Sequence, residues 1–397
     1  LSPPLRLEFE HTDRQYKEGE PLRVSGAVPP AAADVLFMNY GLGVKAFDLK
    51  RKAEAWHFKM ASGVEFAAFV EDGLLLADSG ALTRVDSRSG KEEWRHLQPR
   101  MRGFAVLGPF VYFLAPDPKN EAAMRVWALD AAKGGVVWSQ GFEGTPASDL
   151  FPAGGAVVFT TVEPYRIQLF EAETGKRLLS DATFTRSPNA QVLHASEDTL
   201  ILHSEGRILE AYDLPAGTLR WRANVSRMST RAVEVGPQGV VLLGTQRTGV
   251  GAEERAFLSL IHLRTGKFVR MQTGLDAGDP KYMLLDGARA YLVSREADRS
   301  IGVRAVRLED LSVEWKAVVG EDASTLLPPS LARDHVVLAF YESGADGKYA
   351  YGGALLDKEG KVRQNIRSEY RFERPPGYGV ANGRLIYSVD SKVDVHR

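Results

Sequence analysis

The chain has 397 residues, of which 44% are hydrophobic and 25% are charged, as is typical of a globular protein with a sizeable core. Its 50 Lys and Arg residues nearly balance 51 Asp and Glu residues, so the sequence lacks the basic footprint of a nucleic-acid-binding protein. Cysteine is absent, which excludes disulfide bonds, cysteine-ligated zinc, iron–sulfur clusters and thiol catalysis. We therefore expect no nucleic-acid partner and no cysteine chemistry.

The start of the chain, "LSPPL", carries no Met, as expected of a mature or trimmed chain. If a signal was removed, the protein is exported, and a lipidated Cys before Leu1 would anchor it; a shortened chain explains the same start equally well. The longest uncharged run, residues 103–116, is too short to span a membrane. Gly108 and Pro109 interrupt it, so it predicts a strand, a turn and a strand.

A motif recurs along the whole chain: an acidic residue, then Gly four residues later, then Trp four residues after that. The acidic-type positions are 48, 86, 130, 171, 213, 262, 307 and 357, a period near 44 residues. The residues of the motif are Asp48, Trp56, Asp86, Gly90, Trp94, Asp130, Gly134, Trp138, Gly175, Asp213, Gly217, Trp221, Gly266, Trp315 and Asp357. A repeat of 40–50 residues with a recurrent Trp is typical of a propeller blade.

Each repeat also predicts four short strands. In residues 64–97, "EFAAFV", "LLLAD", "ALTRVD" and "KEEWRHL" are apolar or alternating runs separated by turns rich in Gly, Asp and Ser. Four such strands form one antiparallel blade. No stretch shows sustained helical periodicity.

The motif has a structural interpretation. The acidic residue can accept hydrogen bonds from N–H groups of the turn, and Gly supplies the positive φ that the turn needs. The Trp on the fourth strand can pack against the neighbouring blade and donate its indole N–H to backbone there. We expect these Trp residues to join blades rather than to bind a ligand.

These repeats resemble the PQQ-type propeller family, whose core is A-x-D-x-x-T-G-x-x-x-W, over nearly the whole chain. Among members without catalytic activity, the chain is similar to the BamB-type lipoproteins that assist outer-membrane assembly. Two repeats depart from the pattern by losing the acid, at His262 and Arg307, and three repeats lack the Trp.

The resemblance implies an all-β fold, a single β-propeller domain over residues 1–397. Family precedent gives eight four-stranded antiparallel blades, whereas the raw repeat count gives nine. Residues 377–397 predict three strands of a last blade, which a strand within residues 1–20, such as "LRLEFE" (5–10), would complete. Such a composite blade would close the ring and remove sheet edges.

Catalysis is not expected. The resemblance raises a PQQ-dependent quinoprotein dehydrogenase as an alternative, but those enzymes are typically larger, and the alcohol dehydrogenases among them use a Cys pair. They also need a metal site of carboxylate and amide oxygens, and no such cluster is evident outside the turns. The eight His residues are scattered, and neither a nucleophile elbow nor a phosphate-binding loop is present. We expect no catalytic residue, no metal and no cofactor.

A partner surface is predicted at the loops between second and third strands, which face the same end of every blade. Four are long: 116–124, 246–255, 295–300 and 342–353, and the last three belong to consecutive repeats. Long loops on a rigid scaffold often bind partners, and Tyr and Arg are favoured at interfaces. The candidate residues are Arg247, Glu254, Arg255, Arg295, Arg299, Lys348, Tyr349 and Tyr351. Solvated loops without function are the alternative.

The sequence thus favours a non-catalytic scaffold for protein–protein interaction. By resemblance, it would lie outside the cytoplasm, periplasmic or associated with the outer membrane, and its partners would be envelope assembly components. A propeller that senses an extracytoplasmic ligand is a further alternative.

Overall fold

The computed structural model describes residues 7–12, 20–179, 182–184, 190–204, 208–225, 229–247, 254–320, 323, 325–332, 334–343, 348–368, 377–381, 384–389 and 392–396. Within them the regular structure is β, apart from one 3-10 turn, η1 (Pro30–Ala32). The chain forms two compact units: a middle unit, Leu22–Asn224, and a terminal unit, which combines Leu1–Pro21 with Val225–Arg397. The expectation of a single domain stays a prediction.

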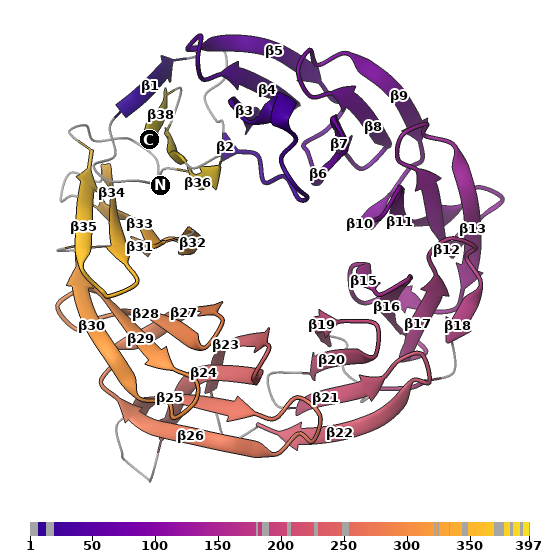
Figure 1. Cartoon of the computed structure of the whole chain (residues 1–397). Helices are drawn as coiled ribbons and strands as arrows, with labels where there is room; N and C mark the ends of the chain where they lie inside the picture. The colour runs from indigo at the N-terminus through magenta and orange to yellow at the C-terminus, as the bar shows by residue number, and fades with distance from the viewer. Residues whose placement is uncertain are drawn as a thin grey trace. The chain divides into compact units, whose positions relative to one another are not determined.

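The middle unit contains twenty of the strands that the structure describes (Figure 1). They are β3 (Val35–Asn39), β4 (Gly43–Asp48), β5 (Ala53–Lys59), β6 (Phe66–Val70), β7 (Gly73–Ala77), β8 (Ala81–Asp86), β9 (Glu92–Leu97), β10 (Arg102–Leu107), β11 (Phe110–Asp117), β12 (Asn120–Asp130), β13 (Val136–Phe142), β14 (Thr145–Pro146), β15 (Phe151–Ala153), β16 (Ala156–Val162), β17 (Arg166–Glu171), β18 (Arg177–Leu179), β19 (Gln191–Ala195), β20 (Thr199–Ser204), β21 (Ile208–Asp213) and β22 (Thr218–Asn224).

The terminal unit contains the remaining described strands. They are β1 (Leu7–Thr12), β2 (Glu20–Pro21), β23 (Ser229–Gly236), β24 (Gly239–Arg247), β25 (Glu254–Ile261), β26 (Phe268–Leu275), β27 (Asp279–Asp286), β28 (Arg289–Arg295), β29 (Ile301–Arg307), β30 (Val313–Val319), β31 (Thr325–Leu326), β32 (Ser330–Ala332), β33 (His335–Ser343), β34 (Tyr349–Asp357), β35 (Val362–Arg367), β36 (Gly377–Ala381), β37 (Arg384–Val389) and β38 (Lys392–His396).

The fold is a β-propeller of four-stranded antiparallel blades, as predicted. The described strands form nine sheets. In six of them consecutive strands pair in chain order, as in β6-β7-β8-β9, and in two more the first strand is split, so that β14 and β15 both pair with β16, and β31 and β32 both pair with β33. The ninth, β1-β38-β37-β36, combines both ends of the chain, so the predicted composite blade is confirmed. Eight sheets are each formed by one continuous stretch of chain, which is the number that family precedent predicts. The composite sheet is the ninth, so the number of sheets equals the raw repeat count.

The burial pattern of a blade explains its sequence. In blade β6–β9, every residue of β7 is buried, as is every residue of β8 except its last, because both strands have neighbours on either side and blades against both faces. The fourth strand, β9, instead alternates between exposed and half-buried residues, because its outer edge meets solvent. Strands two and three therefore appear as continuous apolar runs, and strand four as an alternating one.

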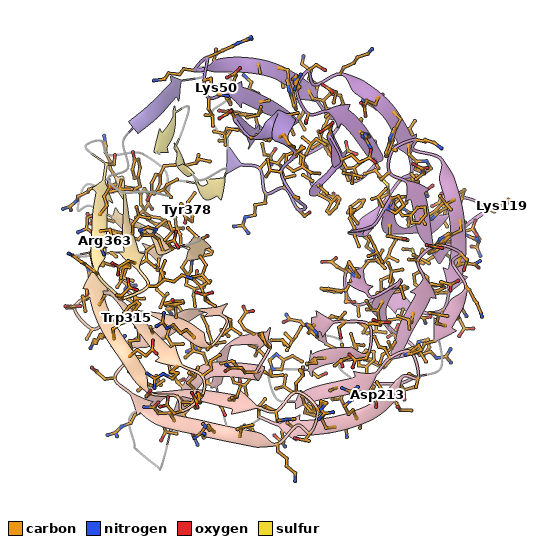
Figure 2. The ribbon with its side chains drawn as sticks, in the orientation of Figure 1. Lys50, Lys119, Asp213, Trp315, Arg363 and Tyr378 are labelled. Atoms are coloured by element: carbon orange, nitrogen blue, oxygen red, sulfur yellow. The ribbon has the colours of Figure 1, made fainter. Side chains whose placement is uncertain are left out.

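The motif Trp residues join neighbouring blades within each unit. The indole N–H of Trp138, on β13, donates to the Ala172 carbonyl of the next blade at 2.8 Å. Trp315, which lies on β30 and is labelled in Figure 2, donates to the Lys358 carbonyl at 2.9 Å. Trp56 and Trp94 donate in the same way to Ser87 and Ala131. This is the arrangement that the repeat predicts.

The turn glycines make room for these indoles. Gly175 has φ +70°, and a Cβ placed on it would lie 2.5 Å from the indole of Trp138. Gly134 faces Trp94 in the same way, with φ +72° and a corresponding distance of 2.5 Å. Both a left-handed backbone and a close approach therefore require Gly at this position.

The corner acids mostly bond to their own turns. Asp130 accepts hydrogen bonds from the backbone N–H groups of Ala132 and Lys133, both at 2.9 Å, as an Asx-turn does. Asp48, Asp86 and Asp357 accept similar bonds. Asp213 differs from the prediction: its carboxylate accepts a hydrogen bond from the Nε of Arg220 at 2.5 Å. There a side chain takes the role of the turn N–H groups.

One interface between blades is built without the Trp. On β26, Arg270 pairs in register with Leu260, the position at which Trp56, Trp138 and Trp315 pair with alanines. In the following turn, Leu311 stands where other blades have Gly, with φ +59°, and it is 1% exposed in one cluster with Leu260 and Leu308. Leucines from the third strand and the turn thus occupy the interface that an indole fills elsewhere.

Candidate partner-binding surface

The predicted loop surface is smaller than the sequence suggested. Residues 116–124 were expected to form a long loop, but β11 runs to Asp117 and β12 starts at Asn120, so they form a hairpin with a short turn. This prediction is wrong because strand ends that extend beyond the core carry the polar side chains of loops. Residues 248–253 and 344–347, within two other predicted loops, lie outside the described residues.

The candidate residues divide into three groups. Arg255, Arg295, Arg299, Lys348 and Tyr349 lie on or beside the loops and are exposed or half-buried. The side chains of Arg247 and Glu254 lie outside the described residues. Tyr351 corrects the prediction: it lies within β34, is 5% exposed, and stacks on Tyr387 with ring centroids 4.0 Å apart.

A cavity of about 460 Å³ opens between two consecutive blades, β27–β30 and β31–β35, lined mostly by strand residues and on one side by the predicted loop 295–300. Its lining combines apolar and polar side chains: Val318, Val319, Phe340, Ile366, Asp298, Ser300, Glu342, Asn365 and Arg367, with Gly320 and Gly353. Val318 is 52% exposed, and Arg367 forms an ion pair with Glu342 at 2.5 Å. We name this site the loop pocket. A lining that combines apolar and polar side chains is typical of a site that accepts one side chain of a partner.

A buried ion pair fixes one wall of the loop pocket. Arg304 on β29 is 1% exposed and donates to Glu296 at 2.7 Å and to Ser294 at 2.8 Å. A Cβ on Gly302 would lie 1.8 Å from a Glu296 oxygen, so Gly302 leaves space for the pair. Glu296 begins the segment that leads to Asp298 and Ser300, so the pair sets the position of this segment.

The charge of Glu296 is expected to make the terminal unit sensitive to acid. Burial raises the pKa of this carboxyl, but hydrogen bonds from Arg304 and Ser294 outweigh it and hold the pKa below its usual value. The resulting stabilisation is present above pH 4.5 and is lost as pH falls through the lowered pKa. Glu296→Gln should cost about 2–3 kcal/mol at pH 7 and progressively less below pH 4.5. Urea unfolding at a series of pH values measures this; an equal difference at pH 7 and pH 3 would contradict it.

The opposite end of blade β27–β30 carries a second, more charged cavity of about 660 Å³. Glu314 there holds two guanidinium groups, with Arg289 at 2.7 Å and Arg307 at 3.0 Å. Lys358 pairs with Asp286 at 2.5 Å. Arg307 stands at the position where other repeats have the corner acid. It takes part in this ion-pair network instead of forming an Asx-turn.

The geometry places the chain in a class: β-propellers made of PQQ-type repeats. The model of the family described as outer membrane protein assembly factor BamB matches residues 102–317, and the chain belongs to that family.

Solved structures share the fold at low sequence identity. BamB from Moraxella catarrhalis is 16% identical, with a TM-score of 0.50 over 83% of this chain and 95% of that one. A eukaryotic initiation factor is 10% identical, with a TM-score of 0.61 over 88% and 91%. The dihydro-heme d1 dehydrogenase NirN, in complex with DHE, is 14% identical, with a TM-score of 0.53 over 92% and 79%. These similarities show the fold alone, because proteins that share one fold can have unrelated activities.

No curated protein sequence matches the chain. In the part of the chain that the structure describes, no helix is long and apolar enough to cross a membrane.

Proposed function

We propose that the protein is a non-catalytic scaffold that binds another protein through the loop pocket. The observation that carries this proposal is the position of Val318, a 52% exposed apolar residue beside the Glu342–Arg367 pair. Charged groups that are already paired need no partner, so the free energy of binding would come from burying apolar surface. Family membership supports the same conclusion.

The partner would be a component of envelope assembly, and the protein would lie outside the cytoplasm, associated with the outer membrane. The family description, outer membrane protein assembly factor, supports this part of the proposal. The scattered His residues and the missing Cys support the non-catalytic role over a quinoprotein dehydrogenase.

Site-specific photo-crosslinking in the cells that produce the protein tests the loop pocket. A photoreactive amino acid at position 318 should yield a discrete crosslinked partner, whereas the same group at Leu97, a 72% exposed residue of the middle unit, should not. Val318→Glu should weaken binding of that partner at least tenfold, because it places a charge in the apolar contact. The affinity would be measured with the purified partner.

Two outcomes would contradict the proposal. Equal crosslinking from positions 318 and 97 would show no preference for the loop pocket. Reduction of an artificial electron acceptor by the purified chain with PQQ and calcium would show that the protein is an enzyme.

A further inference from the structure

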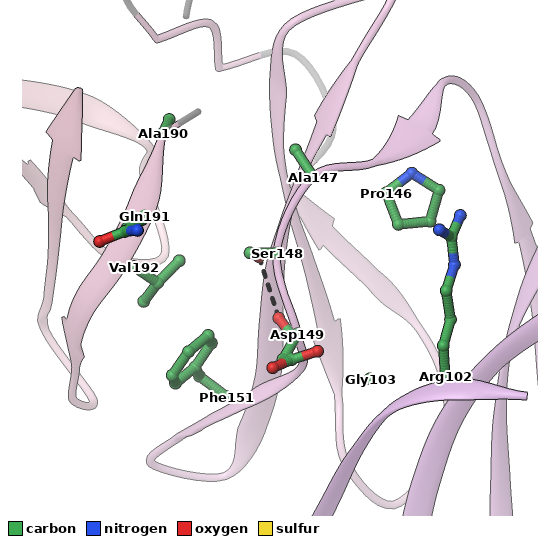
Figure 3. Close-up of a pocket in the computed structure, with 10 residues that line it drawn as sticks. All are labelled: Arg102, Gly103, Pro146, Ala147, Ser148, Asp149, Phe151, Ala190, Gln191 and Val192. Carbon is green, nitrogen blue, oxygen red and sulfur yellow. Dashed lines mark hydrogen bonds between the residues drawn. The ribbon is translucent and has the colours of Figure 1, made fainter. Parts of the chain in front are cut away.

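A cavity of about 420 Å³ lies within the middle unit, far along the chain from the loop pocket (Figure 3). The first strands of three consecutive blades line it: β10, the split strand β14 and β15, and β19. Its side chains include Arg102, Asp149, Gln191, Phe151 and Val192. We name it the inner-strand pocket.

Two adjacent irregularities in the strands form this pocket. In β10, Gly103 has φ +61°, and the register shifts between Arg102 and Ala105. In the next blade the first strand stops at Pro146 and resumes at Phe151. A Cβ on Gly103 would lie 3.4 Å from the Cα of Asp149, so the two irregular segments touch. Bulges often mark functional sites, because they redirect side chains away from the regular ladder.

A side chain takes over one ladder bond at the break. Ala147 still donates its N–H to Thr160, but the Thr160 N–H donates to the Ser148 hydroxyl at 3.0 Å instead of to a carbonyl. These bonds tie residues 147 and 148 to β16, and the exposed Asp149 follows directly. Asp149 is therefore presented to solvent from a fixed backbone.

Two opposite charges face the pocket without a counter-ion. Among the described residues, neither Arg102 nor Asp149 forms an ion pair, and both are exposed. Figure 3 shows Arg102 extending toward Pro146, away from the Asp149 carboxylate. In the same blade as Arg102, Arg125 and Asp117 do pair, at 2.9 Å. The pocket thus offers a cation and an anion separately.

We propose that the inner-strand pocket binds a short peptide segment of a partner protein that carries a basic and an acidic side chain on either side of an apolar one. The acidic side chain pairs with Arg102, whose planar guanidinium suits a carboxylate, and the basic one pairs with Asp149. The apolar side chain packs on Phe151 and Val192, both half-buried in the lining. A volume of about 420 Å³ suits two or three residues rather than a folded domain.

A labelled peptide tests this site directly. The probe is acetyl-Gly-Lys-Leu-Glu-Gly-amide, compared by fluorescence polarisation with acetyl-Gly-Gln-Leu-Gln-Gly-amide on the full chain. The charged peptide should bind at least fivefold more tightly, and the difference should shrink in high salt because exposed charges are screened. Arg102→Gln and Asp149→Asn should each remove most of that preference.

A charge exchange separates recognition from general electrostatics. The double variant Arg102→Asp with Asp149→Arg keeps the net charge and should favour the reversed peptide, acetyl-Gly-Glu-Leu-Lys-Gly-amide, over the original. Val318→Glu should leave peptide binding unchanged, so this proposal and that of the loop pocket can fail separately. Thermal melting of each variant checks that the fold is retained.

Three results would overturn the proposal: equal affinity for the charged and neutral peptides, unchanged preference in both single variants, or no response to the exchange. Tighter binding of free lysine or glutamate than of the peptide would also overturn it, in favour of a small zwitterionic ligand.

Discussion

Trp138→Ala is expected to lower the free energy of unfolding of the middle unit by about 3–5 kcal/mol, the range for loss of a buried Trp. The side chain is 8% exposed and packs between Tyr112 and Phe170, with ring centroids 5.8 Å and 6.4 Å away. Its N–H also bonds to Ala172 of the next blade. The substitution thus leaves a cavity at the interface between two blades and removes one of two hydrogen bonds to the Ala172 carbonyl, which still accepts one from the Tyr112 hydroxyl at 3.1 Å.

Urea unfolding followed by far-ultraviolet circular dichroism measures this loss. Leu97→Ala is the matched control, because Leu97 is also on a fourth strand but is 72% exposed, and it should change the stability by less than about 0.5 kcal/mol. Trp138→Phe should fall between the two, because it keeps most of the apolar area and loses the N–H donor. A Trp138→Ala protein as stable as the Leu97→Ala control would show that the motif Trp does not join the blades.

The repeat predicted much of this architecture because the acid, the Gly and the Trp make the same local contacts wherever they recur in a blade. A fourth-strand indole needs an acceptor and a turn without a Cβ beneath it, so Trp and Gly recur at a fixed spacing, as Trp94 and Gly134 illustrate. The composite blade followed from hydrophobic runs at both ends of the chain. The motif and the apolar runs depend on local sequence, whereas the pairing of the two chain ends follows from the need of a propeller to close.

The candidate sites depended on contacts that local sequence does not encode. Tyr351 carries the same side chain as an exposed interface residue, and only the stacking partner Tyr387, 36 positions later, places it in the core. The inner-strand pocket arises where Gly103 meets Asp149. The sequence predicts Gly103 within an apolar strand, and nothing near it indicates the break between β14 and β15 that it contacts. The sequence did not predict the leucine interface at Leu311 either. The absence of the motif acid and Trp in these repeats shows only where the pattern ends, not which residues replace it.

Leu311→Gly is expected to destabilise the terminal unit by about 3 kcal/mol, although Gly is the motif residue at this turn. The change relieves a left-handed φ of +59°, which costs a non-Gly residue about 1 kcal/mol. It also removes a fully buried side chain from the cluster with Leu260 and Leu308, and that loss is larger. A Gly at this turn is compatible with the interface where a side chain of the preceding blade covers it, as Trp315 covers Gly360 and Leu179 covers Gly217.

Restoring the indole should therefore reverse the effect. Arg270→Trp alone should destabilise the unit, because Leu311 and Leu260 already occupy the interface. Combined with Leu311→Gly and Leu260→Ala, which recreate the surroundings of Trp315, it should recover most of the lost stability. The coupling free energy in this set, measured by urea unfolding, should exceed about 1 kcal/mol and favour the combined variant. Strictly additive losses would mean that Leu311 fills space unrelated to the missing indole.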